Sequence, residues 1–197
     1  MDRRGTPRPS SPLLSGDYEY MTAGYYACQD AELAGADALP TCADALDAYV
    51  VPIALEKAAK AGLAVPEWIL THEYFPVPAV CYGVNPVSRR HEVVRDESAR
   101  RVVARRLTSN FRYSMCCELI TRETEVVEFR MVGGRTESAE FAGWADAVFS
   151  VFRVPLATVR LLRNGKLQLS AIEPLPRRVL TPGEIAWARE LGEAPRG

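Results

Sequence analysis

The sequence predicts an α+β fold: a single domain in which helices pack on a mixed or antiparallel sheet, closed by a C-terminal hairpin and helix. Three observations support this class. Helical and strand-like segments occur in blocks and not in regular alternation. Asn164-Gly165 joins two apolar-rich segments, which is typical of a β-hairpin. The 197 residues, 48% of them hydrophobic, suffice for one sizeable core.

The first third of the chain carries mainly helical signals. Residues 1–16 are rich in Pro, Ser and Arg, so we expect a disordered N-terminal arm there and one α+β domain over residues 17–197. Residues 22–35 have helical spacing. Residues 42–62 carry an apolar stripe interrupted by Pro52, which predicts a kink or two abutting helices.

Strand signals dominate the middle of the chain. We expect strands at the start of residues 66–75 and within 77–86 and 90–95. Residues 98–110 have helical spacing with Ser98 as N-cap. The β-branched and aromatic residues of 113–120 and 124–134 predict two strands paired with each other.

The last third combines a helix, the hairpin and a final helix. Residues 137–152 form an amphipathic pattern with Phe141, Val148 and Phe152 on one face. For the hairpin over residues 157–175, we expect positive φ angles at both Asn164 and Gly165. In residues 181–193, Thr181 and Glu184 have the spacing of a capping box. The order of the elements therefore favours α+β.

Composition argues against several classes. The formal net charge of −1 gives no overall attraction to nucleic acid, and no apolar run reaches the roughly 18 residues of a membrane span. The five cysteines include no C-x-x-C pair, so we expect reduced thiols, a cytoplasmic location and no metal site. No phosphate-binding loop or other catalytic motif is present.

A basic segment is the main candidate for a binding surface. Residues 89–112 contain eight arginines and three acidic residues. Like charges four residues apart on a helix repel, so an anionic ligand would favour this arrangement, whereas the alternative is a solvated helix face. The candidate anion- or substrate-binding residues are Arg101, Arg105, Asn110, Arg112 and Tyr113.

Weaker candidates flank this segment. Asn85 and Arg89 lie in an Asn-Pro turn, for which a purely structural role is the simpler interpretation. Cys116 or Cys117 could act as a nucleophile assisted by His91 if the fold brought them together. Adjacent strand residues point to opposite faces, so packing in the interior is the alternative that we favour.

Two stretches resemble one family of bacterial domains. They are GYYACQDAELAGADALPT (24–41) and FAGWADAVFSVFRVPLATVRLLRNGKLQLSAIEPLPRRVL (141–180). Both are similar to the opening and the close of the N-terminal domain that precedes RimK-like ATP-grasp ligases. The resemblance covers most of residues 18–180.

This resemblance implies a stand-alone accessory or substrate-binding protein. It would work with a separate ATP-grasp carboxylate–amine ligase in peptide modification or natural-product biosynthesis. ATP and magnesium would bind to that partner ligase, with no cofactor in this chain, because the lysines and carboxylates of such a ligase are not recognisable here. An acidic peptide, an amino acid or a nucleotide would be its ligand. The alternatives are a cysteine-dependent enzyme and an RNA- or nucleotide-binding accessory protein, although the net charge argues against nucleic acid.

Overall fold

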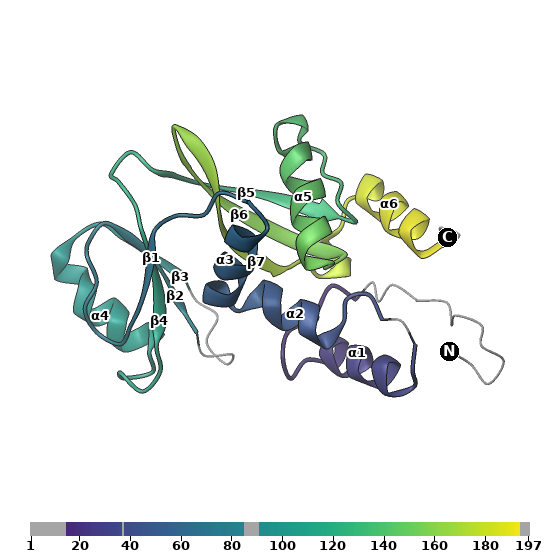
Figure 1. Ribbon diagram of the computed structural model, residues 1–197, viewed down its shortest axis with the longest axis horizontal. Helices are drawn as coiled ribbons and strands as arrows, with labels where there is room; N and C mark the ends of the chain where they lie inside the picture. Colours follow the sequence, from purple (N-terminus) through teal and green to yellow (C-terminus); the bar gives the residue numbers. More distant parts are fainter. Residues whose placement is uncertain (1–14, 37, 85–90, 194–197) are drawn as a thin grey trace. The chain divides into compact units, whose positions relative to one another are not determined.

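The computed structural model describes residues 15–36, 38–84 and 91–193. In these ranges the helices are α1 (Ala23–Leu33), α2 (Cys42–Tyr49), α3 (Val51–Lys60), α4 (Glu97–Leu107), α5 (Ala142–Phe152) and α6 (Pro182–Glu193). The strands are β1 (Trp68–Thr71), β2 (Ala79–Gly83), β3 (His91–Val94), β4 (Met115–Leu119), β5 (Glu125–Val132), β6 (Leu156–Asn164) and β7 (Lys166–Pro174) (Figure 1). The predicted α+β class, with antiparallel sheets and a C-terminal hairpin and helix, is confirmed.

The contacts between residues group into two compact units. Unit 1 comprises the described residues of 1–49, 128–159 and 172–197, and unit 2 comprises residues 50–127 and 160–171. Residues 1–14 of the predicted arm lie outside the described residues. A single domain over residues 17–197 stays a prediction. None of the helices in the described ranges has the length and apolar content needed to span a lipid bilayer.

Unit 2 contains a four-stranded antiparallel sheet in the order β1-β4-β2-β3. In its register, Cys117 of β4 lies opposite Ile69 of β1 on one side and Cys81 of β2 on the other. Tyr82 of β2 lies opposite both Cys116 and His91. Because residues directly opposite each other share a face, this register assigns each side chain of β4 to one side of the sheet.

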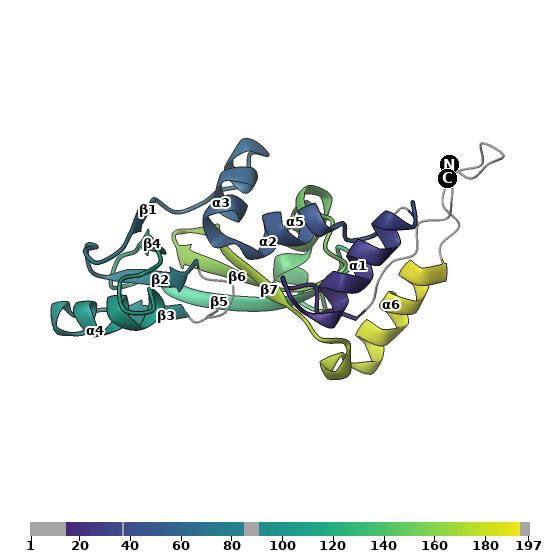
Figure 2. The same cartoon turned by 90° about the horizontal axis from the view of Figure 1, so that it is seen from below.

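Helix α4 covers one face of this sheet, and both views show it beside the strands (Figures 1 and 2). Val103, Ala104 and Leu107 of α4 pack against alternate strand residues, including Cys81 and Cys117. These positions follow the 3.6-residue period of a helix and the two-residue period of a strand. The apolar side of α4 is therefore buried, and Arg101, Arg105 and Arg106 are exposed.

The opposite face of the sheet packs on α3 and on residues of the β6–β7 hairpin. Val51 and Leu55 of α3 form a cluster with Val80, Tyr82 and Cys116 of the sheet. Leu162 and Ala171 of the hairpin complete it. The sheet of unit 2 thus separates two apolar clusters.

Unit 1 combines α1, α2, α5 and α6. Thr22 caps α1 by accepting a hydrogen bond from the Tyr25 backbone N–H at 3.3 Å. Thr181 and Glu184 form the predicted capping box at α6, with reciprocal bonds of 2.8 and 3.2 Å. The shared face of Phe141, Val148 and Phe152 is buried as predicted.

The second sheet has the order β5-β6-β7 and corrects two expectations. Strand β4 pairs with β1 and β2, and not with β5, because the residues between β4 and β5 lead the chain into this other sheet. Gly165 has a φ of +70°, but Asn164 ends β6 and is not among the described residues with positive φ. The hairpin turn is therefore not type I′.

Two helix starts can also be compared with the sequence. Pro52 lies in the first turn of α3, directly after α2 ends, so the predicted pair of abutting helices is confirmed. Asp96 and not Ser98 occupies the N-cap position of α4, without a capping hydrogen bond from its side chain. Asp96 has the extended backbone of an N-cap residue, and a negative side chain there interacts favourably with the helix dipole.

Candidate functional site

The four arginines of α4 divide into two pairs by their partners. Arg100 forms an ion pair with Glu97, and Arg106 forms one with Glu92 of β3. Arg101 and Arg105 are exposed, and neither forms an ion pair with any described residue. They are i,i+4 neighbours on one face of the helix, so their charges repel across a short distance. Two cations without an ion-pair partner among the described residues therefore lie about one helical turn apart.

A tight turn follows α4 and is held together by Thr108. This threonine is fully buried, and its hydroxyl donates to the carbonyl oxygen of Ala104 at 2.6 Å. The same hydroxyl accepts the backbone N–H of Phe111 at 2.7 Å. Ser109, Asn110 and Phe111 have φ values of 51, 63 and 65°, a left-handed conformation that costs non-glycine residues energy. The turn reverses the chain so that Asn110 and Phe111 return toward α4.

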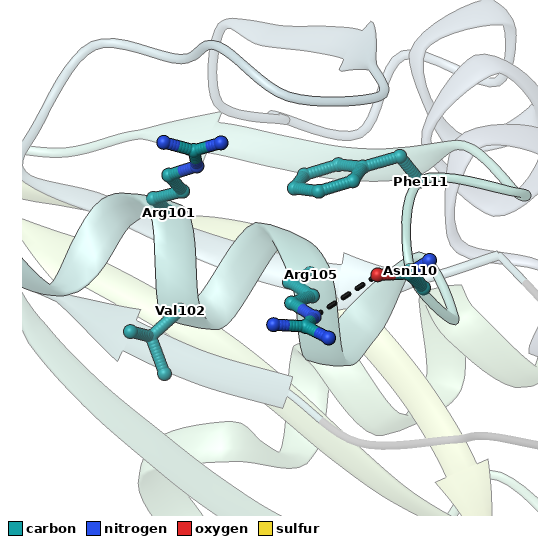
Figure 3. Close-up of a pocket in the computed structure, with 5 residues that line it drawn as sticks. All are labelled: Arg101, Val102, Arg105, Asn110 and Phe111. Atoms are coloured by element: carbon teal, nitrogen blue, oxygen red, sulfur yellow. Dashed lines mark hydrogen bonds between the residues drawn. The ribbon is translucent and has the colours of Figure 1, made fainter.

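The turn and the helix together line an open pocket of about 330 Å³. It is lined by Arg101, Val102, Arg105, Asn110 and Phe111. Nε of Arg105 donates to Oδ1 of Asn110 at 3.0 Å, as the dashed line in Figure 3 shows. In the same view the ring of Phe111 extends from the turn toward the side of the helix that bears Arg101. We call this group the basic pocket.

Three of the predicted binding residues thus meet in the basic pocket, and two do not. Arg101, Arg105 and Asn110 line it. Arg112 and Tyr113 are exposed and are not among its lining residues; the guanidinium of Arg112 lies 5.6 Å from the centroid of the Tyr113 ring. The weaker candidates Asn85 and Arg89 lie outside the described residues.

The two adjacent cysteines point to opposite faces of the sheet and are both fully buried. Cys117 faces Cys81, and the hydrogen bond between them raises the pKa of the Cys81 thiol, as does burial. Burial and Glu118 raise the pKa of Cys116. His91 is exposed on β3, two strands from β4, which places the two backbones about 10 Å apart. The geometry therefore gives no thiol–imidazole pair, and the raised pKa values oppose a thiolate.

A chain of four polar side chains lies buried in unit 2. Arg160 Nη1 lies 3.4 Å from the Tyr82 hydroxyl, to which it donates. The Tyr82 and Ser170 oxygens are 2.6 Å apart, and the Ser170 hydroxyl donates to Oε2 of Glu118 at 2.5 Å. Because the Ser170 proton is directed at Glu118, the Tyr82 hydroxyl must be the donor to Ser170. We call this series from Arg160 to Glu118 the buried polar chain.

Glu118 is the most unusual member of this chain. Its side chain is fully buried, and Oε1 has no hydrogen-bond partner. Burial raises the pKa of Glu118 to about 8, although Ser170 and Arg160 act in the opposite direction. The carboxyl group is therefore close to its titration point at neutral pH, and it can either donate or accept a proton.

Sequence reasoning missed the buried polar chain, although a signal was present. Glu118 is the single charge in the apolar stretch MCCELI, and Arg160 is the single charge in the largely apolar stretch ATVRLL. Charged residues are rarely fully buried without a partner, so a lone charge in such a strand indicates a partner elsewhere in the chain. The identity of the partner depends on which strands pack together, which the sequence does not show.

Comparison with known proteins places this geometry in a known fold. No protein-family model matches the chain. No curated protein matches it by sequence. Solved structures do match, the first being a RimK-domain ATP-grasp protein from Sphaerobacter thermophilus DSM 20745, with 12% identity and a TM-score of 0.64. That match covers 86% of this chain and 77% of the other.

Two further matches are ligases of known type. The D-alanine–D-alanine ligase from Helicobacter pylori is 13% identical with a TM-score of 0.63, covering 86% of this chain and 68% of the other. The ATP-grasp ligase PsnB, solved with a minimal precursor, is 11% identical with a TM-score of 0.50, covering 80% of this chain and 60% of PsnB. At these identities the likeness shows the fold alone.

These matches correct the predicted function. The expected stand-alone accessory protein, acting beside a separate ligase, is wrong, because 86% of this chain superimposes on ATP-grasp ligases themselves. The short sequence stretches that suggested an accessory domain lie within a fold that the ligases also have. The chain therefore has the fold of an ATP-grasp ligase.

Proposed function

We propose that this chain is an ATP-grasp ligase that uses ATP to join the carboxylate of an amino acid or peptide to an amine. The observation that carries the proposal is the fold likeness over 86% of the chain to a RimK-domain protein and a D-alanine–D-alanine ligase. One matched ligase is named for an amino acid, D-alanine, and another was solved with a minimal precursor. Amino acids and peptides are accordingly the substrate class that we propose.

The reaction that this class implies has two steps. A substrate carboxylate oxygen attacks the terminal phosphorus of ATP, which gives an acyl phosphate and releases ADP. The amine nitrogen then attacks the acyl carbon, phosphate leaves, and the nitrogen loses a proton. Catalysis of such steps consists mainly of placing the reactants and stabilising negative charge.

We assign the buried polar chain a supporting role in this reaction: its side chains are buried, so it would hold the strands of unit 2 in place and not touch the ligand. Ionisable groups with strongly shifted pKa values are concentrated at functional sites. Oε1 of Glu118 has no hydrogen-bond partner, and burial raises the pKa of this carboxyl group to about 8. Arg160 is a permanent cation within the same chain of hydrogen bonds.

The described residues offer no complete binding site for a magnesium ion. The described residues hold no group of three or more His, Cys, Asp or Glu side chains that could bind a metal ion. Magnesium in nucleotide sites is held through one or two carboxylates together with phosphate oxygens. A metal carried by the nucleotide is compatible with that pattern, and we assign no residue to it.

The narrower resemblance, to the N-terminal domain that precedes RimK-like ligases, stays a proposal. It is supported by residues 24–41 and 141–180. An alignment of closely related chains would test it. Residues 24–41 and 141–180 should align with the N-terminal domain that precedes RimK-like ligases, and not with the nucleotide-binding part of the ligases.

The experiment incubates the purified chain with ATP, magnesium and pools of amino acids and dipeptides. ADP release is measured enzymatically and coupled products by mass spectrometry. We expect ADP release that depends on a substrate pool, and a reduction of at least about tenfold in Glu118→Gln. Glu125→Gln is the matched control, because Glu125 is exposed and pairs with Arg163 at 3.5 Å.

Binding of ATP is measured separately by the shift of thermal unfolding. A chain whose unfolding temperature does not respond to ATP, and that releases no ADP with any pool, would contradict the proposed ligase activity. Equal loss of activity in Glu118→Gln and Glu125→Gln would contradict the role of the buried polar chain, but it would leave the proposed ligase activity standing.

A further inference from the structure

We propose that the basic pocket binds carboxylate side chains of an acidic peptide. This site lies on the outer side of α4, whereas the buried polar chain involves the opposite face of the sheet in unit 2. The inference concerns recognition and not the ligation step, and it does not rest on the proposed ligase activity.

The charge pattern of α4 supports a specific site over a generally basic surface. Arg100 and Arg106 already have carboxylate partners within the chain, Glu97 and Glu92. Only Arg101 and Arg105 are left without one among the described residues, and these are the two arginines that line the pocket. An incoming carboxylate would relieve the repulsion between them and form charge-assisted hydrogen bonds.

The pocket is ordered before a ligand arrives. Asn110 holds Nε of Arg105 at 3.0 Å, so the two terminal nitrogens of that guanidinium are left to donate to a ligand. Thr108 fixes the left-handed turn that presents both Asn110 and Phe111. A side chain that is already held loses less conformational entropy on binding.

The turn favours a carboxylate over a phosphate. Phosphate sites commonly use free backbone N–H groups at a helix N-terminus or nest. Here the N–H groups of Asn110, Phe111, Arg112 and Tyr113 all donate within the turn, to Arg105 and Thr108. The pocket also lies at the C-terminal half of α4, where the helix dipole is negative and opposes a doubly charged anion more than a singly charged one.

The shape of the pocket favours a peptide over a small metabolite. Four of its five lining residues are exposed, so the pocket is open at the surface and would not enclose a free ligand. The Phe111 ring and the Val102 methyl groups supply apolar contact beside the two cations. A glutamate side chain offers both groups, since its aliphatic stem can lie on the ring while its carboxylate meets one of the guanidinium groups.

The test measures binding of a fluorescein-labelled, end-capped hexaglutamate peptide to the full chain by anisotropy, without nucleotide. An end-capped hexaglutamine peptide is the ligand control. We expect Arg101→Gln and Arg105→Gln each to weaken binding by about tenfold. Arg106→Gln removes the same charge from the same helix at an ion-paired position, and we expect it to change binding by less than about twofold. Thermal unfolding of each variant verifies that it is folded.

Competition separates the possible ligands. We expect glutarate to displace the labelled peptide at lower concentration than inorganic phosphate does. Equal weakening by Arg105→Gln and Arg106→Gln would overturn the proposal, because it indicates diffuse attraction. Stronger displacement by phosphate, or tighter binding of a labelled oligoribonucleotide than of hexaglutamate, would also overturn it.

Discussion

The Ser170 hydroxyl donates a 2.5 Å hydrogen bond to Oε2 of Glu118 in the interior of unit 2. Ser170 belongs to β7 and Glu118 to β4, so this bond joins two strands that are 52 residues apart in sequence. It satisfies only one oxygen of the carboxyl group, since Oε1 has no partner. Burial favours the protonated form of Glu118, so the stability of the chain should depend on pH.

We predict that stability falls between about pH 4.5 and pH 8. Burial raises the pKa of Glu118 from 4.5 to about 8 in the folded chain. Because the folded pKa lies above the unfolded one, this contribution is fully present below pH 4.5 and is lost as pH rises through 8. The loss approaches about 1.4 kcal/mol per pH unit at most. Urea unfolding at a series of pH values measures it.

Glu118→Gln is the control for this prediction. An amide of the same shape does not titrate, so the slope attributed to Glu118 should disappear in the variant. Parallel pH profiles for the two proteins would show that other groups cause the slope.

Tyr82→Phe should lower the free energy of unfolding by about 1–3 kcal/mol. The change removes the hydroxyl that connects Arg160 to Ser170 and leaves both partners buried. Tyr74→Phe is the matched control, because Tyr74 is exposed and keeps the ring that lies 4.3 Å from the Arg100 guanidinium. Urea unfolding should show no more than about 0.5 kcal/mol of change in this control. Similar losses in both variants would argue against the buried polar chain as the cause.

Arg153→Gly should stabilise the chain by up to about 1 kcal/mol. Arg153 follows α5 with a φ of 55°, the left-handed conformation in which helices commonly end on glycine. Its side chain is exposed. Arg153→Ala removes the same side chain and retains the unfavourable φ, so it should give no gain. The two variants are compared by thermal and urea unfolding, and equal stabilities would contradict the backbone explanation.

Alkylation of the folded chain should be confined to Cys42. Cys28, Cys81, Cys116 and Cys117 are fully buried, whereas Cys42 is half-buried. Burial and Glu32 raise the pKa of Cys42, so even this thiol should react slowly at neutral pH. Mass spectrometry after iodoacetamide treatment should show at most one adduct natively and five in urea. Rapid native modification of Cys116 or Cys117 would contradict the buried placement.

The sequence predicted local structure well where one short segment determines it. Thr181 and Glu184 are three residues apart, so their capping box needs no information from the rest of the chain. Pro52 likewise separates α2 from α3 because proline lacks a backbone donor. Strand partners were harder to predict. Strand β4 pairs with β1 and β2, which precede it by more than 30 residues, and not with the next strand.

The candidate site likewise divides into a part that is local in sequence, which could be predicted, and a part that depends on distant strands, which could not. Arg101, Arg105 and Asn110 meet because they are close in sequence and lie on one helix and the turn after it. The buried polar chain unites side chains from β2, β4, β6 and β7, and no spacing in the sequence encodes that meeting. Glu118 could have been singled out as a lone charge in an apolar strand, but its partner Ser170 could not.

The alternation of side chains along β4 has an evolutionary consequence. Met115 and Cys117 pack in the cluster under α4. Cys116 packs in the cluster under α3 and the hairpin, and Glu118 accepts a hydrogen bond from Ser170 of the hairpin. Substitutions on the outer surface of α4 can therefore accumulate without disturbing the buried polar chain. Relatives of this chain can therefore vary the surface of α4 while the hydrogen bonds beneath the other face are inherited unchanged.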